Sequence, residues 1–206
     1  MLYNKLHDNG HVFLNMGSTN KDPWIASKVA RIFSKYFTLQ NDIVWVKAIT
    51  IEGNSRGHIK PITSERYLSH AYEHIYHFTK SGNSKIDRLA VGVKFKFKSE
   101  MKRRKHGNDK RCAGNVWFIP YETVQSKSDK YNHPASFPLE LPTRCLKLAG
   151  IQKDSAVFDP FLGSGTTLVA AKLLGVESLY GCDLDKKYVD ISRNRLSDIT
   201  GKTLFD

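Results

Sequence analysis

The sequence predicts an α/β fold with a parallel sheet, and the last third of the chain carries most of this prediction. There, short apolar runs alternate with segments whose apolar residues recur every three to four positions. The expected elements are strand 155–159, helix 166–175, strand 178–183 and helix 186–197. Two strands joined through a helix are parallel neighbours, and the helices then cover the faces of the sheet. The 206 residues are 40% hydrophobic and 25% charged, which is typical of a globular chain and excludes a disordered one.

The first 150 residues contain further strands and two helices. Enrichment in apolar, β-branched and aromatic residues predicts strands 11–16, 42–47, 72–79 and 116–119. Helical spacing predicts helices 24–36 and 139–149. Asp22 is expected to cap the first helix, with Pro23 at its first position, and Trp117 is expected in the core. A polar loop, 52–66, and a basic, glycine-containing insert, 80–115, lie between these elements.

Positive charge is concentrated outside the last quarter of the chain. The 32 Lys and Arg against 20 Asp and Glu give a net charge of +12. Residues 151–206 contribute 7 − 8 = −1, whereas residues 1–150 contribute 25 − 12 = +13, and the segment 94–111 alone holds nine basic and two acidic residues. This pattern favours a polyanionic partner, with nucleic acid as the first candidate and a solvated surface loop as the alternative. The Lys-Phe-Lys-Phe-Lys alternation of 94–98 predicts an edge strand with its lysines facing outward.

Several other classes of protein are excluded. No apolar run approaches the ~18 residues that a membrane-spanning helix needs. The three cysteines, Cys112, Cys145 and Cys182, are odd in number and widely spaced, so they form neither a zinc-binding spacing nor a disulfide framework. We therefore expect a protein of the reducing cytoplasm that binds neither metal nor membrane.

The strongest chemical motif is a glycine turn between a strand and a helix. Gly163, Ser164 and Gly165 follow strand 155–159, and the helix beginning at Thr166 offers free N–H groups and a positive dipole end. Asp183 ends the next strand, 20 residues after Gly163, at the spacing from which a carboxylate reaches ribose hydroxyls. The third glycine of a dinucleotide fingerprint and the lysine of a nucleotide-triphosphate loop are both missing. The motif therefore predicts a site for a nucleoside with an amino-acid tail, the alternative being a structural tight turn.

Three segments of this region, HPASFP, DPFLGSGTT and GCDLD, resemble the S-adenosylmethionine-dependent DNA amino-methyltransferases of the permuted, or β, group. The segments FLNMG, IVWVK, EHIYHFTKSG and GNVWFIPYETV also look like parts of that family, so the resemblance extends over nearly the whole chain. It is most specific over 133–185 and weaker over the basic insert. It implies a Rossmann-like methyltransferase sheet with a basic target-recognition insert, and methyl transfer to the exocyclic N4 of cytosine or N6 of adenine in double-stranded DNA.

The resemblance also implies roles for individual residues. The cofactor loop corresponds to Asp159, Pro160, Phe161, Gly163, Ser164, Gly165, Thr166 and Thr167. The segment lining the methionine end corresponds to His133, Pro134, Ala135, Phe137 and Pro138. Asp183 matches the ribose-binding acid and Leu184 the residue that packs on the adenine ring. The candidates for DNA contact are Arg56, His58, Lys60, Arg66, Arg103, Arg104 and Lys105.

One feature of the family is absent from this sequence. The catalytic loop of the family is Asp, Ser or Asn followed by Pro-Pro and Tyr or Phe, and no Pro-Pro occurs here. Asp22-Pro23-Trp24 follows the wrong strand to replace it. We therefore expect a chain that begins just after the catalytic loop, with an incomplete sheet, one missing strand lying between 155–159 and 11–16. Direct pairing of these two strands is the costlier alternative.

The resulting hypothesis is a site-specific methyltransferase of the restriction–modification type that is inactive alone, with N4-cytosine slightly favoured over N6-adenine. A second polypeptide carrying the catalytic segment is a candidate partner. The expected organisation is a rear part of the catalytic region at 1–51, the recognition insert at 52–115 and the cofactor-binding region at 116–206. The alternative function is a non-catalytic module that binds DNA, the cofactor or both.

Overall fold

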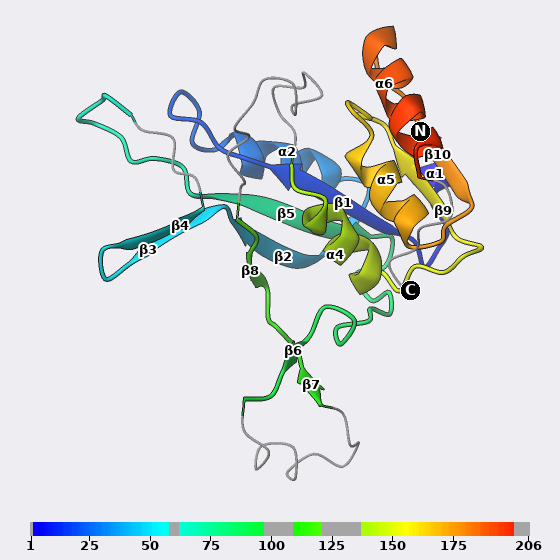
Figure 1. Ribbon diagram of the computed structural model, residues 1–206, viewed down its shortest axis with the longest axis horizontal. Coiled ribbons are helices and arrows are strands. Elements are labelled where there is room, and N and C mark those ends of the chain that lie inside the picture. The colour runs from blue at the N-terminus through cyan, green and yellow to red at the C-terminus, as the bar shows by residue number, and fades with distance from the viewer. Residues whose placement is uncertain (1, 58–61, 97–108, 121–136, 200–206) are drawn as a thin grey trace. The chain divides into compact units, whose positions relative to one another are not determined.

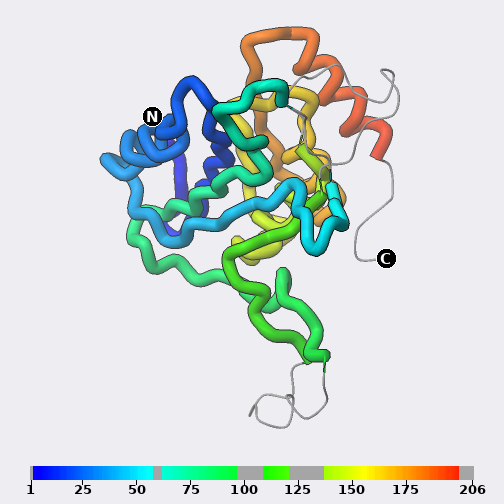
Figure 2. Tube along the Cα trace, turned by 90° about the vertical axis from the view of Figure 1, so that its left-hand side faces the viewer, coloured from blue at the N-terminus to red at the C-terminus, as the bar shows by residue number. Residues whose placement is uncertain are grey.

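The computed structural model describes residues 2–57, 62–96, 109–120 and 137–199. The chain divides into two compact units, Met1–Pro120 and Tyr121–Asp206, and each has its own sheet. Figures 1 and 2 trace the chain from its N-terminus to its C-terminus through both units.

The first unit is built on a four-stranded mixed sheet with the order β1-β5-β2-β8. Its strands are β1 (His11–Met16), β2 (Thr38–Val46), β5 (Tyr72–Thr79) and β8 (Val116–Phe118). The β1/β5 and β5/β2 pairs are antiparallel and the β2/β8 pair is parallel, so this sheet is mixed. The predicted bounds of β1 and β5 are confirmed. The start of β2 at 42 is wrong, because Thr38 and Leu39 already pair with the end of β5 before an irregularity between Leu39 and Asn41.

Two helices, α1 (Leu2–Lys5) and α2 (Ile25–Phe33), provide the apolar residues that cover one face of this sheet. Ala26 and Ala30 of α2 pack with Tyr76 and Phe78, which are alternate residues of β5 and therefore lie on one face. The helix is shorter than the predicted 24–36. Asp22 is also not its N-cap, because Trp24 occupies that position without a side-chain cap. The Asp22 carboxylate instead accepts a hydrogen bond from the Trp24 backbone N–H at 3.1 Å and pairs with Lys28.

The strands β2 and β8 each contribute one buried tryptophan to the core. Trp45 and Trp117 are register partners, and each is almost completely buried. The indole N–H of Trp45 donates to the Ile119 carbonyl at 2.8 Å, and that of Trp117 donates to the Gly114 carbonyl at 3.1 Å. The prediction that Trp117 lies in the core is confirmed.

A chain of polar side chains crosses three strands of the same sheet. The ring nitrogens of the fully buried His77 lie 2.8 Å from His11 Nδ1 and 2.9 Å from Asn41 Nδ2. Because Asn41 Nδ2 only donates, His77 accepts through Nδ1 and carries its proton on Nε2, toward His11. A neutral ring therefore satisfies both neighbours. Burial, with a smaller contribution from His11, lowers the pKa of His77 to about 4.

This histidine should make the fold sensitive to acid. Only the unfolded chain takes up a proton at His77 near pH 6.5, so stability is lost as the pH falls from about 6.5 to about 4. We expect the free energy of unfolding in urea to drop by roughly 2 kcal/mol between pH 7.5 and pH 5 from this group. Burial lowers the pKa of His11 too, which acts in the same direction. A His77→Gln variant can keep both hydrogen bonds and should lose most of this dependence, and an unchanged pH slope in that variant would contradict the assignment.

Two short hairpins extend the first unit. The first joins β3 (Ala48–Ile51) to β4 (Asn54–Gly57), and the second joins β6 (Val93–Lys94) to β7 (Lys110–Arg111). The prediction of an irregular loop over 52–66 is therefore wrong for 54–57. Of the predicted edge strand at 94–98 only Lys94 is in a strand, and Phe97 and Lys98 lie outside the described residues.

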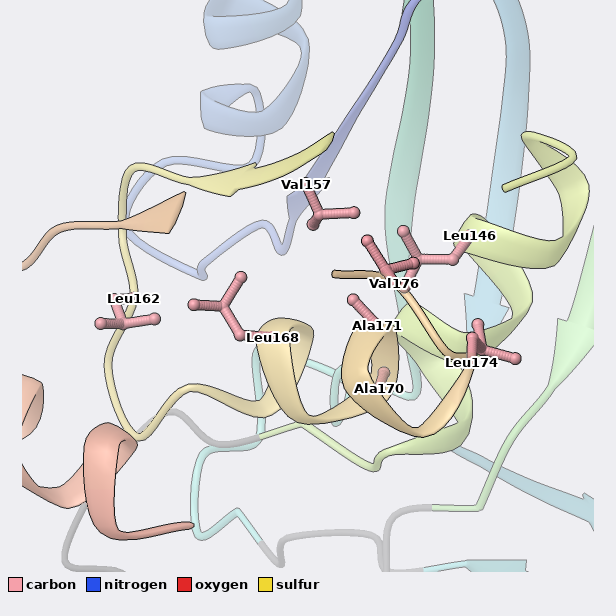
Figure 3. Packing of buried hydrophobic residues seen from close by; sticks show 8 residues of the cluster. All are labelled: Leu146, Val157, Leu162, Leu168, Ala170, Ala171, Leu174 and Val176. Carbon is pink, nitrogen blue, oxygen red and sulfur yellow. The ribbon is translucent and has the colours of Figure 1, made fainter. Parts of the chain in front are cut away.

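Over residues 137–199, the described part of the second unit, one helix precedes a strand–helix–strand–helix arrangement. The strands β9 (Ala156–Asp159) and β10 (Ser178–Gly181) are parallel, and the helices are α4 (Glu140–Leu148), α5 (Thr166–Leu173) and α6 (Lys186–Ser197). Figure 3 shows how residues from α4, β9, α5 and the turns beside them form the core, which consists of Leu146, Val157, Leu162, Leu168, Ala170, Ala171, Leu174 and Val176. The predicted order of elements is confirmed, and the bounds of α6 are as predicted. Strand β10 ends two residues early, because its partner strand stops at Asp159, where the Phe161 N–H donates to the Asp159 carboxylate and not to β10.

Candidate functional site

The glycine turn begins where β9 ends. The Asp159 carboxylate accepts a hydrogen bond from the Phe161 backbone N–H at 3.0 Å, which turns the chain out of the strand. Gly163 and Gly165 then adopt φ angles of 48° and 79°, in the left-handed region that favours glycine. Helix α5 starts directly afterwards at Thr166, so the N–H groups of its first turn point toward the turn region without intrahelical acceptors.

Asp183 lies against this turn. Its Oδ2 accepts a hydrogen bond from the Gly163 N–H at 2.8 Å, and its Oδ1 accepts one from the Asp185 N–H at 3.0 Å. A carboxylate accepts up to about four hydrogen bonds, so these two do not prevent it from accepting others from hydroxyl groups. The arrangement fixes a negative charge at the carboxyl end of the strand pair, where ligands bind in open α/β sheets.

Two apolar side chains that are close in sequence to Asp183 and Gly163 are fully or nearly fully exposed to solvent. Phe161, two residues before Gly163, is 85% exposed, and Leu184, directly after Asp183, is completely exposed. Scattered exposed apolar residues are ordinary, but these two flank one hydrogen bond between a carboxylate and a glycine.

Helix α6 holds the turn through two residues that the sequence analysis did not identify. The guanidinium of Arg195 donates from Nη1 to the Ser164 carbonyl at 2.6 Å, to Ser164 Oγ at 3.1 Å and to Thr166 Oγ1 at 3.2 Å. Ser192, one helical turn earlier, is almost completely buried against Gly165. A Cβ on Gly165 would lie 2.1 Å from Ser192 Oγ, so this glycine is required by a close approach as well as by its φ angle.

The i, i+3 spacing of Ser192 and Arg195 places both on one side of α6, which is the only sequence signal that could have pointed to them. That spacing does not say what they face. The approach of α6 to the turn results from the packing of the unit and becomes visible only in three dimensions.

Most of the predicted cofactor residues lie in this small region. The structure brings together Asp159, Pro160, Phe161, Gly163, Ser164, Gly165, Thr166, Thr167, Asp183 and Leu184. Phe137 and Pro138 lie directly before α4 and are half-buried, whereas His133, Pro134 and Ala135 lie outside the described residues.

The predicted DNA contacts are only partly described. Arg56 on β4 and Arg66 in the segment after it are exposed. The other five, His58, Lys60, Arg103, Arg104 and Lys105, lie outside the described residues. Within the described part of the chain no three His, Cys, Asp or Glu side chains form a group that could hold a metal ion. No helix among the described residues is long and apolar enough to cross a membrane.

The fold and the turn together define a class of protein: an α/β chain with a glycine turn and a carboxylate at the carboxyl end of a parallel strand pair, the edge at which such sheets bind ligands. The chain belongs to the DNA methylase family, whose sequence pattern it matches over residues 1–194. It is 36% identical over 125 residues to the type II methyltransferase M.BglI of Bacillus subtilis, covering 61% of this chain and 30% of that protein. It is 29% identical over 183 residues to the type II methyltransferase M2.LlaDCHI of Lactococcus lactis subsp. cremoris, covering 84% of this chain and 59% of that protein.

Solved structures agree on the fold. The PvuII DNA methyltransferase, named as cytosine-N4-specific, superimposes with a TM-score of 0.68 at 19% identity, covering 94% of this chain and 66% of that one. The complex of M1.HpyAVI with SAM superimposes with a TM-score of 0.58 at 21% identity, covering 92% and 76%. The expected Rossmann-like methyltransferase fold is confirmed. The chain spans less than two thirds of the length of the curated relatives M.BglI and M2.LlaDCHI.

Proposed function

We propose that this chain is the cofactor-binding and DNA-binding part of a site-specific DNA methyltransferase of the restriction–modification type. The observation that carries the proposal is the hydrogen bond from the Gly163 N–H to the Asp183 carboxylate, with the exposed Phe161 and Leu184 next to these residues in the sequence. Membership in the DNA methylase family and the type II methyltransferases among the relatives support it.

The residues of the turn fit S-adenosylmethionine. Asp183 would accept hydrogen bonds from the ribose hydroxyls, and Leu184 and Phe161 would cover the adenine ring. The N-terminus of α5 suits a carboxylate, and the amino-acid tail of the cofactor has one. When bound, S-adenosylmethionine supplies an electrophilic methyl group on a positively charged sulfur. His133, Pro134, Ala135 and Phe137 remain our candidates for the methionine end.

We propose that the catalytic group for the base comes from outside these 206 residues. An exocyclic amine shares its lone pair with the base ring, so it needs a hydrogen-bond acceptor and an aromatic ring to stack on the flipped base. The family provides both with its Pro-Pro loop, and this sequence has none. In the described residues, β1 and β9 are each paired along one side only, so each can accept an added strand. We propose that a second polypeptide, or sequence beyond these residues, supplies the loop and such a strand.

The target base and the DNA contacts are also proposals. We propose N4 of cytosine as the first amine to test, with N6 of adenine as the alternative, because the residues IPYETV and HPASFP look closest to cytosine enzymes. The recognition region remains proposed for 52–115. Because β5 pairs with β1 and β2, DNA contacts within that range would come from the segments on either side of β5, which contain the proposed basic residues.

Complementation tests the proposal. The 206-residue chain is incubated with tritiated S-adenosylmethionine and a random-sequence duplex, alone and with a separate polypeptide that carries a Ser- or Asp-Pro-Pro-Tyr segment from a relative such as M2.LlaDCHI. We expect calorimetric binding of S-adenosylmethionine by the chain alone, no label in the DNA, and label at cytosine or adenine after the addition.

Two outcomes would contradict parts of this proposal. Methylation by the chain alone would show that its catalytic group lies within these residues. Absence of cofactor binding together with DNA binding would favour the alternative function, a non-catalytic DNA-binding module.

A further inference from the structure

The β3–β4 hairpin carries two isoleucines whose side chains are partly exposed to solvent. Ile49 is 38% exposed and Ile51 is 59% exposed, although both lie in a regular antiparallel pair. In Figure 1 the hairpin extends away from the end of β2 as a two-stranded arm of the first unit. Two isoleucines side by side on a projecting hairpin form a small exposed apolar surface that is available to a partner.

The two faces of the arm differ in chemistry. Ile49 is the register partner of Arg56, and Ile51 is the partner of Asn54, so the two isoleucines and Arg56 share one face. The opposite face carries Thr50 and Ser55, whose hydroxyl groups are 2.6 Å apart. One face is therefore apolar with a positive charge, and the other is small and polar.

The arm is fixed in shape at both of its ends. Its two-residue turn has positive φ angles at Glu52 (49°) and Gly53 (79°), the conformation whose twist matches that of a hairpin. At its base the Lys47 N–H donates to the Ala71 carbonyl at 2.7 Å, which ties the arm to the segment leading into β5. Because the arm is already ordered, binding a partner would cost it little conformational entropy.

The charge of the first unit selects the kind of partner. Residues 1–120 hold 21 Lys and Arg against 9 Asp and Glu, a net charge of +12, whereas residues 121–206 hold 11 of each. A polyanion is thus attracted to the unit that bears the arm. A two-stranded β-ribbon fits the major groove of DNA, and isoleucine is among the side chains that insert between base steps from the minor groove.

We propose that the β3–β4 arm enters a groove of duplex DNA, with Ile49 and Ile51 against the bases and Arg56 on a phosphate. This rests on the proposed function, in which the first unit binds DNA. The arm would thus add an apolar contact, whose strength does not depend on salt. The electrostatic contact of the first unit with DNA does depend on salt.

The test separates these two kinds of contact. Binding of the full chain to a fluorescein-labelled 30-base-pair duplex pool of random sequence is followed by anisotropy over a series of salt concentrations. The Ile49→Ser/Ile51→Ser variant should bind roughly 5- to 10-fold more weakly at every salt concentration with an unchanged salt slope, because no charge is lost. The Arg56→Gln variant should instead lower the slope by about 1. Ile32→Ser/Leu39→Ser, which alters exposed apolar residues elsewhere in the first unit, should bind like the wild type.

Wild-type affinity in the isoleucine variant, or an equal loss in the control variant, would overturn the inference while leaving DNA binding itself intact. Self-association of the wild-type chain in sedimentation equilibrium that the isoleucine variant abolishes, with DNA binding unchanged, would assign the arm to a second copy of the chain. Failure of the wild-type chain to bind the duplex at all would overturn both this inference and the proposed function.

Discussion

Replacing Asp183 with alanine is expected to weaken the binding of S-adenosylmethionine by one to two orders of magnitude, or roughly 1.5–3 kcal/mol. The change removes charge-assisted hydrogen bonds to the ribose. It also removes the acceptor that holds the Gly163 N–H at 2.8 Å, so the turn loses one of its supports. Isothermal titration calorimetry measures the affinity directly.

A matched variant separates the two effects. Asp183→Asn keeps an oxygen that can accept from Gly163 but has no charge, so its affinity should fall between those of the wild type and Asp183→Ala. Thermal unfolding shows whether either variant changes the stability of the second unit. Wild-type affinity in Asp183→Ala would remove Asp183 from the site.

Gly165→Ala is expected to destabilise the second unit by roughly 2–5 kcal/mol and to abolish cofactor binding. The new Cβ would lie 2.1 Å from Ser192 Oγ and 2.8 Å from Ser192 Cβ, so the turn or α6 must move. A φ of 79° adds backbone strain for any residue that has a Cβ. Urea unfolding and calorimetry measure the two losses.

A second substitution distinguishes the steric clash from the backbone strain. Ser192→Gly removes the two nearest atoms that the new Cβ would meet, Oγ and Cβ, and leaves only the Ser192 Cα at 3.3 Å. Alone it should cost about 1 kcal/mol as a glycine within a helix. The double variant Gly165→Ala/Ser192→Gly should therefore be more stable than the sum of the two single effects predicts, and it should retain part of the cofactor affinity. Strictly additive losses would show that the contact between Gly165 and Ser192 does not limit the turn.

The elements predicted best from the sequence are those with local signals at both ends. Strand β1 follows Gly10 and precedes Gly17, and its predicted bounds are those observed. Helix α6 begins where Asp185 accepts a hydrogen bond from the Lys187 N–H at 2.9 Å, a capping interaction between neighbours in sequence. The link from Asp183 to Gly163 was predictable as well, because a strand–turn–helix–strand unit places those two positions at the same edge of the sheet.

The parts that could not be predicted depend on distant contacts. Three of the first four residues of β2, Thr38, Gln40 and Asn41, are polar, and this segment becomes a strand only through pairing with β5. The β3–β4 arm has no run of apolar residues on its second strand, where Arg56 and Ser55 stand opposite Ile49 and Thr50. Arg195 looks like an ordinary surface residue of an amphipathic helix until its contacts with Ser164 are known.

The division of charge between the units has a consequence for the two ligands proposed here. S-adenosylmethionine is itself a cation at its sulfur, and its proposed site is in the unit whose acidic and basic residues cancel. A strongly cationic protein surface would weaken the binding of a cation, whereas it attracts a phosphate backbone. Added salt would therefore weaken the binding of DNA and change the binding of S-adenosylmethionine much less. Under such conditions the chain would release DNA and keep S-adenosylmethionine bound.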